Sequence, residues 1–132
     1  MTRRAVFLEG AKHTLPFSPA LVWRDMVFVS GQVGKDPATG EFQPGIAAQA
    51  RQTLENVRAV LQAAGSSMSD VLQVTIYMTD MQGEFAELNT VYREFFPEGV
   101  RPARSTVGIS HLALPGLKVE IDVVAAVSSA AS

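Results

Sequence analysis

Two side chains in the second half of the chain, Arg104 and Glu120, could together bind an acid and move a proton. Arg104 stands at the entry to an expected strand, and its planar guanidinium suits a two-point grip on a carboxylate. Glu120 lies between two apolar residues in the last expected strand, where burial would tune its proton affinity for general acid or base catalysis. A structural ion pair of Arg104 with Glu120 or Asp122 is the alternative explanation of these residues.

Two further polar residues are candidates for the same site. Asn89 lies on the second expected helix, and its amide offers both a hydrogen-bond donor and an acceptor. Ser30 ends an expected strand just before Gly31, where its hydroxyl could hold a water or a substrate carboxylate. For Asn89 the alternative is an exposed helix residue, and for Ser30 it is a serine that only forms a turn.

The other residue types exclude several kinds of site. The chain has no cysteine, and its two histidines, His13 and His111, are isolated in expected loops, so we expect no metal. The sequence contains no Gly-x-Ser-x-Gly motif, P-loop or Gly-x-Gly-x-x-Gly, so neither a serine-hydrolase elbow nor a bound nucleotide cofactor is indicated.

Composition also limits the partners and the location of the protein. Eleven Lys and Arg residues against 13 Asp and Glu give a net charge of −2, and no basic stripe is present, so we expect no nucleic-acid partner. No apolar run approaches the roughly 20 residues of a membrane span. Together with the absence of cysteine and of a signal-peptide pattern, this predicts a cytoplasmic protein without a membrane partner.

The candidate residues are carried by a single expected domain, residues 1–132, with a frayed tail from about residue 128. The clearest element is a helix over 46–64, in which apolar residues recur every three or four positions until Gly65 ends it. A second amphipathic helix is expected over 84–96. The expected strands, which complete the order β-β-β-α-β-α-β-β, are 6–8, 21–23, 26–30, 71–78, 105–110 and 117–127.

Alternation along the strands assigns their side chains to two faces. Both helices need an apolar sheet face to cover, and two helices of this size cannot cover both faces. The second face would carry Arg104 and Thr106 on one strand, and Glu120 and Asp122 on the last. We therefore expect other subunits to cover it. The residues assigned to the helix-covered face are Leu72, Val74, Ile76, Met78, Val107, Ile109, Val119, Ile121 and Val123.

Five short motifs, in order between about residues 16 and 126, resemble the RidA (YjgF) family of enamine and imine deaminases. The specificity comes from their order and spacing, because each motif alone is weak. They are Ser30-Gly31-Gln32 with 36–41, the helical run 49–57, Asn89-Thr90-Val91-Tyr92 with Phe95-Phe96-Pro97, the run 102–107, and Val119-Glu120-Ile121.

The resemblance implies a chorismate-mutase-like α+β fold, with one sheet and two helices on one face, assembled as a homotrimer with three interfacial sites. It also implies hydrolysis of reactive enamines and imines, of the 2-aminoacrylate/2-iminopropanoate type, to a 2-oxo acid and ammonia, without a cofactor. As catalytic residues, Arg104 would hold the substrate carboxylate and Glu120 would orient or activate the water. The substrate-binding residues would be Phe17, Ser30, Asn89 and Thr106.

Three other functions are considered beside this one. The same trimer could bind a small carboxylate through Arg104 and report it to a partner without catalysis, although a binder gains nothing from the charge of Glu120. The last strands also resemble 2-aminomuconate deaminases of the same superfamily. An endoribonuclease activity, attached to some family members, is disfavoured by the acidic balance of the chain.

Overall fold

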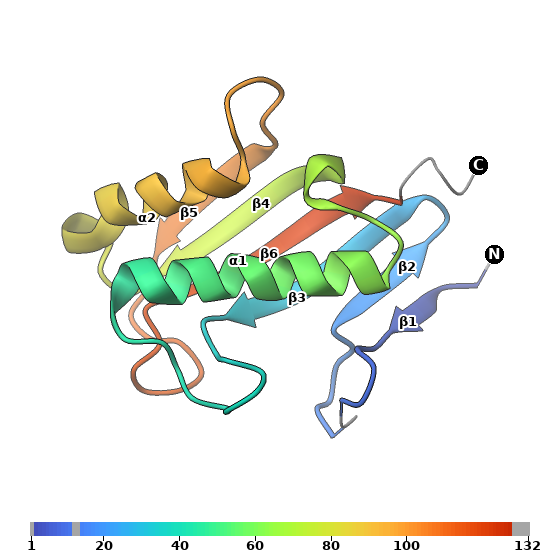
Figure 1. Cartoon of the computed structure of the whole chain (residues 1–132), viewed down its shortest axis with the longest axis horizontal. Coiled ribbons are helices and arrows are strands. Elements are labelled where there is room, and N and C mark those ends of the chain that lie inside the picture. Colours follow the sequence, from blue (N-terminus) through green and yellow to red (C-terminus); the bar gives the residue numbers. More distant parts are fainter. Residues whose placement is uncertain (1, 12–13, 128–132) are drawn as a thin grey trace.

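The computed structural model describes residues 2–11 and 14–127, and within them it shows one six-stranded sheet with both helices packed on one face (Figure 1). The expected order of elements is confirmed, with a single 3-10 turn, η1 (Met68–Asp70), added to it. His13 and the expected tail lie outside the described residues. The helices are α1 (Gly45–Ala63) and α2 (Met81–Phe95), and the strands are β1 (Arg4–Val6), β2 (Ala20–Trp23), β3 (Met26–Val33), β4 (Val71–Met78), β5 (Ala103–Gly108) and β6 (Val119–Ala126).

The sheet order, β1-β2-β3-β6-β4-β5, brings the last strand into the middle. Strand β6 pairs antiparallel with both β3 and β4, whereas β5 pairs with β4 in parallel and forms an edge. Strands β2 and β3 form a hairpin whose turn is Arg24-Asp25, since Trp23 pairs with Met26. Glu120 is therefore carried by a central strand and Arg104 by an edge strand.

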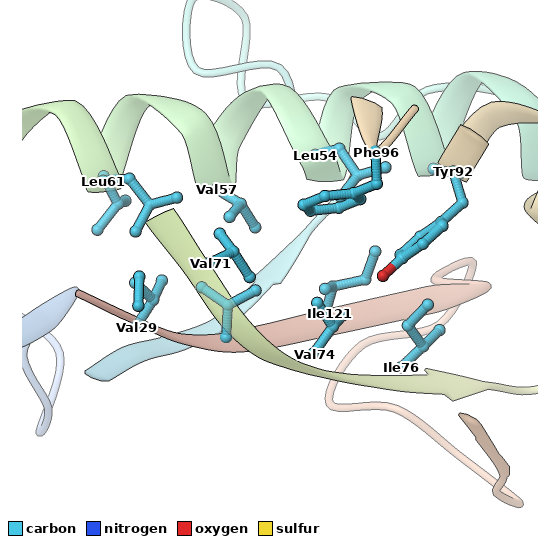
Figure 2. Packing of buried hydrophobic residues seen from close by; sticks show 14 of the residues in the cluster. Val29, Leu54, Val57, Leu61, Val71, Val74, Ile76, Tyr92, Phe96 and Ile121 are labelled. Carbon is cyan, nitrogen blue, oxygen red and sulfur yellow. The ribbon is translucent and has the colours of Figure 1, made fainter. Parts of the chain in front are cut away.

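Helix α1 covers the centre of the sheet with the apolar stripe that its periodicity predicts. Gly65, at φ 81°, follows the end of the helix as expected. All six residues that the spacing places on the stripe are buried, namely Ile46, Ala50, Leu54, Val57, Leu61 and Ala64. The stripe lies on the apolar side chains of three strands (Figure 2). The labelled contacts in this layer are Leu54, Val57 and Leu61 from the helix, above Val29, Val71, Val74, Ile76 and Ile121.

Helix α2 begins three residues earlier than expected, because Asp80 caps it. The Asp80 side chain accepts a hydrogen bond of 3.0 Å from the Gly83 amide. The helix buries Leu88 and Tyr92 against the sheet, whereas Phe85, whose spacing from both would place it on the same apolar side, is 39% exposed. Phe85 belongs instead to the outer flank of the helix, which faces the edge of the sheet.

Two bulges interrupt the alternation of the central strands, and the one in β4 changes its predicted face. One interrupts the pairing of β3 with β6 between Val29 and Gln32, and the other interrupts the pairing of β4 with β6 between Val71 and Gln73. An extra residue in a bulge reverses the alternation that precedes it. Val71 is consequently buried, and the assignment of Leu72 to the apolar face is wrong, since Leu72 is 50% exposed.

The two predicted faces of β5 are also wrong, because the structure exchanges them. This correction matters most for function. The parallel register pairs Arg104 with Val74 and Thr106 with Ile76, whose side chains lie fully buried beneath the helices. Directly paired residues point to the same side of a sheet, so Arg104 and Thr106 face the helices, and Val107 faces away. The edge position explains the error, because the apolar faces of the helices end before β5 and packing alone does not decide its orientation.

The sheet face turned away from the helices is called the open face below. Its central carboxylates come from β6, where Glu120 pairs with Tyr77 and Asp122 pairs with Thr75. Arg104 and Glu120 therefore lie on opposite faces of the sheet, contrary to the expectation that they share one. The open face includes Trp23, Phe28, Gln73, Thr75, Tyr77, Val107, Glu120 and Asp122.

We expect Gly34→Ala to weaken the packing of α1 against the end of β3. A Cβ at position 34 would lie 2.7 Å from the backbone oxygen of Gln49 and 2.8 Å from its Cα. Backbone atoms of a packed helix cannot rotate aside, so the substitution forces the helix outward. The free energy of unfolding, measured by urea denaturation, should fall by about 1–3 kcal/mol.

Gly31→Ala is the matched control for this substitution. A Cβ at position 31 would overlap the carboxylate of Glu120, which is the movable end of a side chain. The loss of stability should therefore stay below about 1 kcal/mol. Equal losses in the two variants would contradict the argument that the backbone of α1 limits position 34.

Candidate functional site

Arg104 is held in a fixed orientation that leaves one edge of its guanidinium available. Its Nε donates a hydrogen bond of 2.7 Å to Oγ1 of Thr106. The guanidinium carbon lies 4.5 Å from the centre of the Tyr92 ring and 5.7 Å from that of Phe85. Among the described residues neither Nη atom has a hydrogen-bond or ion-pair partner, so the alternative ion pair with the β6 carboxylates is not formed within the chain.

A pocket of ≈ 220 Å³ opens beside this guanidinium, between α2, the loop that follows it and β5. The structure thus brings Asn89 together with Arg104 and Thr106, as expected. It also brings in Arg93 and Arg101, which the sequence analysis missed. A signal for Arg93 was present, since it lies one helical turn after Asn89 and so shares its face. The lining residues are Asn89, Tyr92, Arg93, Arg101, Pro102 and Arg104.

Burial makes the charged form of Arg104 less favourable without neutralising it. Desolvation, as the largest cause, lowers the pKa of Arg104, the nearby Tyr92 raises it, and the like charge of Arg93 lowers it further. An arginine remains protonated at neutral pH under such a shift. The site therefore presents a partly desolvated cation to the pocket, which an incoming anion would stabilise.

Glu120 lies on the open face, against the bulge of β3. Its carboxylate occupies the space that a side chain at position 31 would fill, so glycine at that position makes room for it. Burial, and after it the negative charge of Asp122, raises the pKa of Glu120 above its usual value. A carboxylate whose pKa is raised is a stronger base, which suits it to accept a proton from water.

Asp122 is held by its neighbours on β4. The side chains of Tyr77 and Thr75 donate hydrogen bonds to it, and these partly offset the burial that raises the pKa of Asp122. In turn the charge of Asp122 is the largest cause of the raised pKa of Tyr77. Asp122 is thus the hydrogen-bonded member of the carboxylate pair, and it acts on Glu120 through its charge.

Ser30 lies next to Gly31 and fixes the loop that precedes β2. Its hydroxyl donates a hydrogen bond of 2.6 Å to the carbonyl oxygen of Ser18, and its amide donates one of 2.9 Å to that of Pro19. These bonds give Ser30 a structural role, while its oxygen keeps the capacity to accept a further hydrogen bond. They also hold Phe17, which is 55% exposed, in the same loop.

The predicted site residues therefore form two groups. Asn89, Arg104 and Thr106 lie at the helix-covered edge, whereas Ser30 and Glu120 lie at the bulge on the opposite side. Two strand spacings and a three-residue offset along β4 separate Arg104 from Glu120, which corresponds to roughly 14 Å between their Cα atoms. With the sheet between the side chains, a small acid held by Arg104 cannot reach Glu120 of the same chain.

The described ranges contain neither of two features that would suggest another kind of site. Within residues 2–11 and 14–127, no three His, Asp or Glu side chains converge as a metal site requires. No helix in the same ranges is both long and apolar enough to cross a membrane.

Asp122→Asn should lower the pKa of Glu120, because it removes a negative charge that opposes ionisation. The measurement is the carboxyl 13C chemical shift of Glu120 against pH, which should titrate at lower pH in the variant. Asp25→Asn removes the same charge at the hairpin turn, about 20 Å along the strand and beyond the Debye length, and should leave the titration unchanged. An unshifted Glu120 titration in Asp122→Asn would show that the two carboxylates are not coupled.

Comparison with known proteins gives consistent results. Residues 10–127 match a family model described as Endoribonuclease L-PSP. A RutC family protein of Pyrococcus horikoshii is 42% identical over 125 residues, covering 93% of this chain and 97% of the relative. The 2-iminobutanoate/2-iminopropanoate deaminase of Escherichia coli is 38% identical over 112 residues, covering 83% and 86%. The crystal structure of Escherichia coli TdcF with bound serine has a TM-score of 0.86 and 36% identity, covering 95% of this chain and 99% of that chain.

Proposed function

The chain belongs to the RidA (YjgF) family, and on that premise we propose that it hydrolyses 2-imino acids, and the enamines that tautomerise to them, to 2-oxo acids and ammonia. The observation that carries the proposal is the free edge of Arg104 in a pocket of ≈ 220 Å³. A bidentate cation beside a cavity of that size suits the carboxylate of a small acid. The deaminase name of the Escherichia coli relative and the serine bound to TdcF support this class of substrate.

Substrate binding uses the fixed orientation of Arg104. The hydrogen bond from Nε to Thr106 and the stacking on Tyr92 hold the guanidinium plane, so that both Nη atoms donate to the substrate carboxylate. Asn89, on the same pocket wall, donates to or accepts from the imine nitrogen or the water. The imine carbon is thereby held at a defined distance from the carboxylate anchor, which favours attack from one direction.

Hydrolysis requires one base and no redox partner. Glu120 accepts a proton from a water molecule as the water oxygen bonds to the imine carbon, and the π electrons of the C=N bond move to nitrogen. Glu120 passes this proton to that nitrogen to give a carbinolamine, and then transfers the hydroxyl proton of the carbinolamine to the same nitrogen. The C–N bond breaks and the carbonyl forms as ammonia leaves. One water is consumed, one 2-oxo acid and one ammonia are released, and the ammonia takes up a proton from the solvent. The raised pKa of Glu120 suits it both to accept the proton from water and to donate it to the nitrogen.

The two groups of site residues meet if copies of the chain assemble with the open face covered. The open face exposes large apolar side chains, among them Trp23 at 42% and Phe28 at 45%, which a second copy would bury. The carboxylates on that face and the unpaired Arg104 at the edge are also complementary in charge. We propose a homotrimer in which Arg104 of one chain and Glu120 of the next contact the same substrate at each of three interfaces.

Glu120→Gln should lower turnover of 2-iminopropanoate by about 10²–10⁴-fold while the assembly and the binding of a small carboxylate persist. Glutamine keeps the size of the side chain but cannot accept the proton. Ammonia release from 2-aminoacrylate generated in situ measures the rate. Glu87→Gln makes the same change at an exposed position of α2 and should retain the parent rate.

Three outcomes would contradict parts of this proposal. Unchanged turnover in Glu120→Gln would remove Glu120 from the chemistry. Absence of turnover in the parent protein, with tight carboxylate binding, would favour the regulatory binding module. The same samples are incubated with RNA, since the family model is described as an endoribonuclease, and cleavage by the parent protein would contradict the deaminase proposal.

Mixing two inactive variants tests whether each site uses two chains. Arg104→Ala and Glu120→Gln should each be inactive as pure proteins. After they are unfolded together and reassembled, about a quarter of the interfaces combine an intact Arg104 with an intact Glu120, so about a quarter of the parent activity should return. Sedimentation should show trimers throughout. No recovery of activity in mixed trimers would place both residues in one chain's site and overturn the assembly.

A further inference from the structure

The pocket beside Arg104 carries more positive charge than one substrate carboxylate requires. Three of its six lining residues are arginines: Arg93 on α2, Arg101 in the loop that follows, and Arg104 on β5. No acidic side chain is among the lining residues. The chain as a whole has a net charge of −2, so this concentration of positive charge is local and does not follow from its composition.

The three pocket arginines form no ion pair among the described residues, whereas two arginines elsewhere on the chain do. Arg51 pairs with Glu94 at 2.9 Å, and Arg58 pairs with Glu55 at 2.7 Å. Within the described residues, by contrast, none of the three pocket arginines forms an ion pair. Like charges gathered without a counter-ion repel one another, and an anion in the pocket would remove that repulsion.

Arg101 is positioned to serve as a second anchor. Its Nε donates a hydrogen bond of 2.8 Å to the carbonyl oxygen of Phe96, at the end of α2. This bond uses one donor and leaves the Nη edge for a ligand, as the bond from Arg104 to Thr106 does. Arg93 adds a third cation from the helix, and its charge reaches Arg104, whose pKa it lowers.

The groups that the proposed assembly brings to the substrate supply less negative charge than the three guanidinium groups carry. Of the two carboxylates on the open face, Asp122 is engaged with Tyr77 and Thr75 of its own sheet. A neighbouring Glu120 and the substrate carboxylate then supply one negative charge each, which leaves one guanidinium group without a counter-charge. A second acidic group on the substrate would fill that role. A protonated imine nitrogen would add to the positive charge in the pocket and so increase the need for a second negative group.

We propose that the pocket selects imino and enamino acids that carry a second carboxylate, with the 2-carboxylate on Arg104 and the distal carboxylate on Arg101 and Arg93. This inference rests on the proposed function and names its substrate class. Imines derived from acidic amino acids, and longer unsaturated dicarboxylic enamines, have this chemistry. The distal carboxylate takes no part in bond making, so the products are a dicarboxylic 2-oxo acid and ammonium.

The test compares kcat/KM for imines generated in situ by an amino-acid oxidase from aspartate or glutamate and from alanine. The parent protein should prefer the dicarboxylic imine by at least about tenfold, and Arg101→Gln or Arg93→Gln should each lower the preference ratio by about three- to tenfold. Arg58→Gln removes the same charge from α1, outside the pocket, and should leave the ratio unchanged. Added salt should lower the ratio in the parent.

The other outcomes separate this inference from the proposed function. A ratio near one in the parent, or equal loss of both activities in the pocket variants, overturns the substrate class while hydrolysis stands. If neither imine is hydrolysed, the proposed function fails. Calorimetry with succinate and butyrate then tests whether the pocket binds a dicarboxylate more tightly than a monocarboxylate. Tighter binding of succinate that weakens in Arg101→Gln supports a dianion site, and equal binding of the two acids overturns it.

Discussion

Strand β4 is paired on both sides, antiparallel to β6 and parallel to β5, and this double pairing determines which chemistry each face of the sheet carries. Val74 and Ile76 are fully buried beneath the helices, so a shift of β4 by one residue would expose them. Once β4 is fixed, Arg104 must face the helices and Glu120 must face away. The separation of cation and carboxylate thus follows from the packing of two apolar side chains that touch no ligand.

The helices were predictable because their apolar periodicity is determined by the chain itself, and all six expected core residues of α1 are buried. The face of β5 was not predictable in this way. Arg104 and Thr106 alternate with Ser105 and Val107, and neither set is apolar enough to identify the core side. Only the register with β4 decides it, and that register is a long-range property. The bulges in β3 and β4 are likewise invisible in the alternation of apolar residues.

The site residues were likewise predictable only in part. Motif spacing identified Arg104, Asn89 and Thr106, which the structure brings together, and Ser30, which lies beside Glu120. Arg101 was missed because it lies in a loop, where no periodicity indicates direction. Its place in the pocket is set by the hydrogen bond to the carbonyl oxygen of Phe96, a residue that is buried in the core at the end of α2.

The space at Gly31 has a consequence for the divergence of related sequences. The Glu120 carboxylate fills the volume of a side chain at position 31, so the two positions constrain each other across the β3–β6 pairing. Alanine at 31 costs little stability but moves the carboxylate, so a homologue that needs glutamate 120 in this position has to keep glycine at 31, whereas one with a shorter residue at 120 is free to accept alanine or serine. Covariation of this pair would therefore distinguish lineages that retain the carboxylate chemistry from those in which the fold has been adapted to another use.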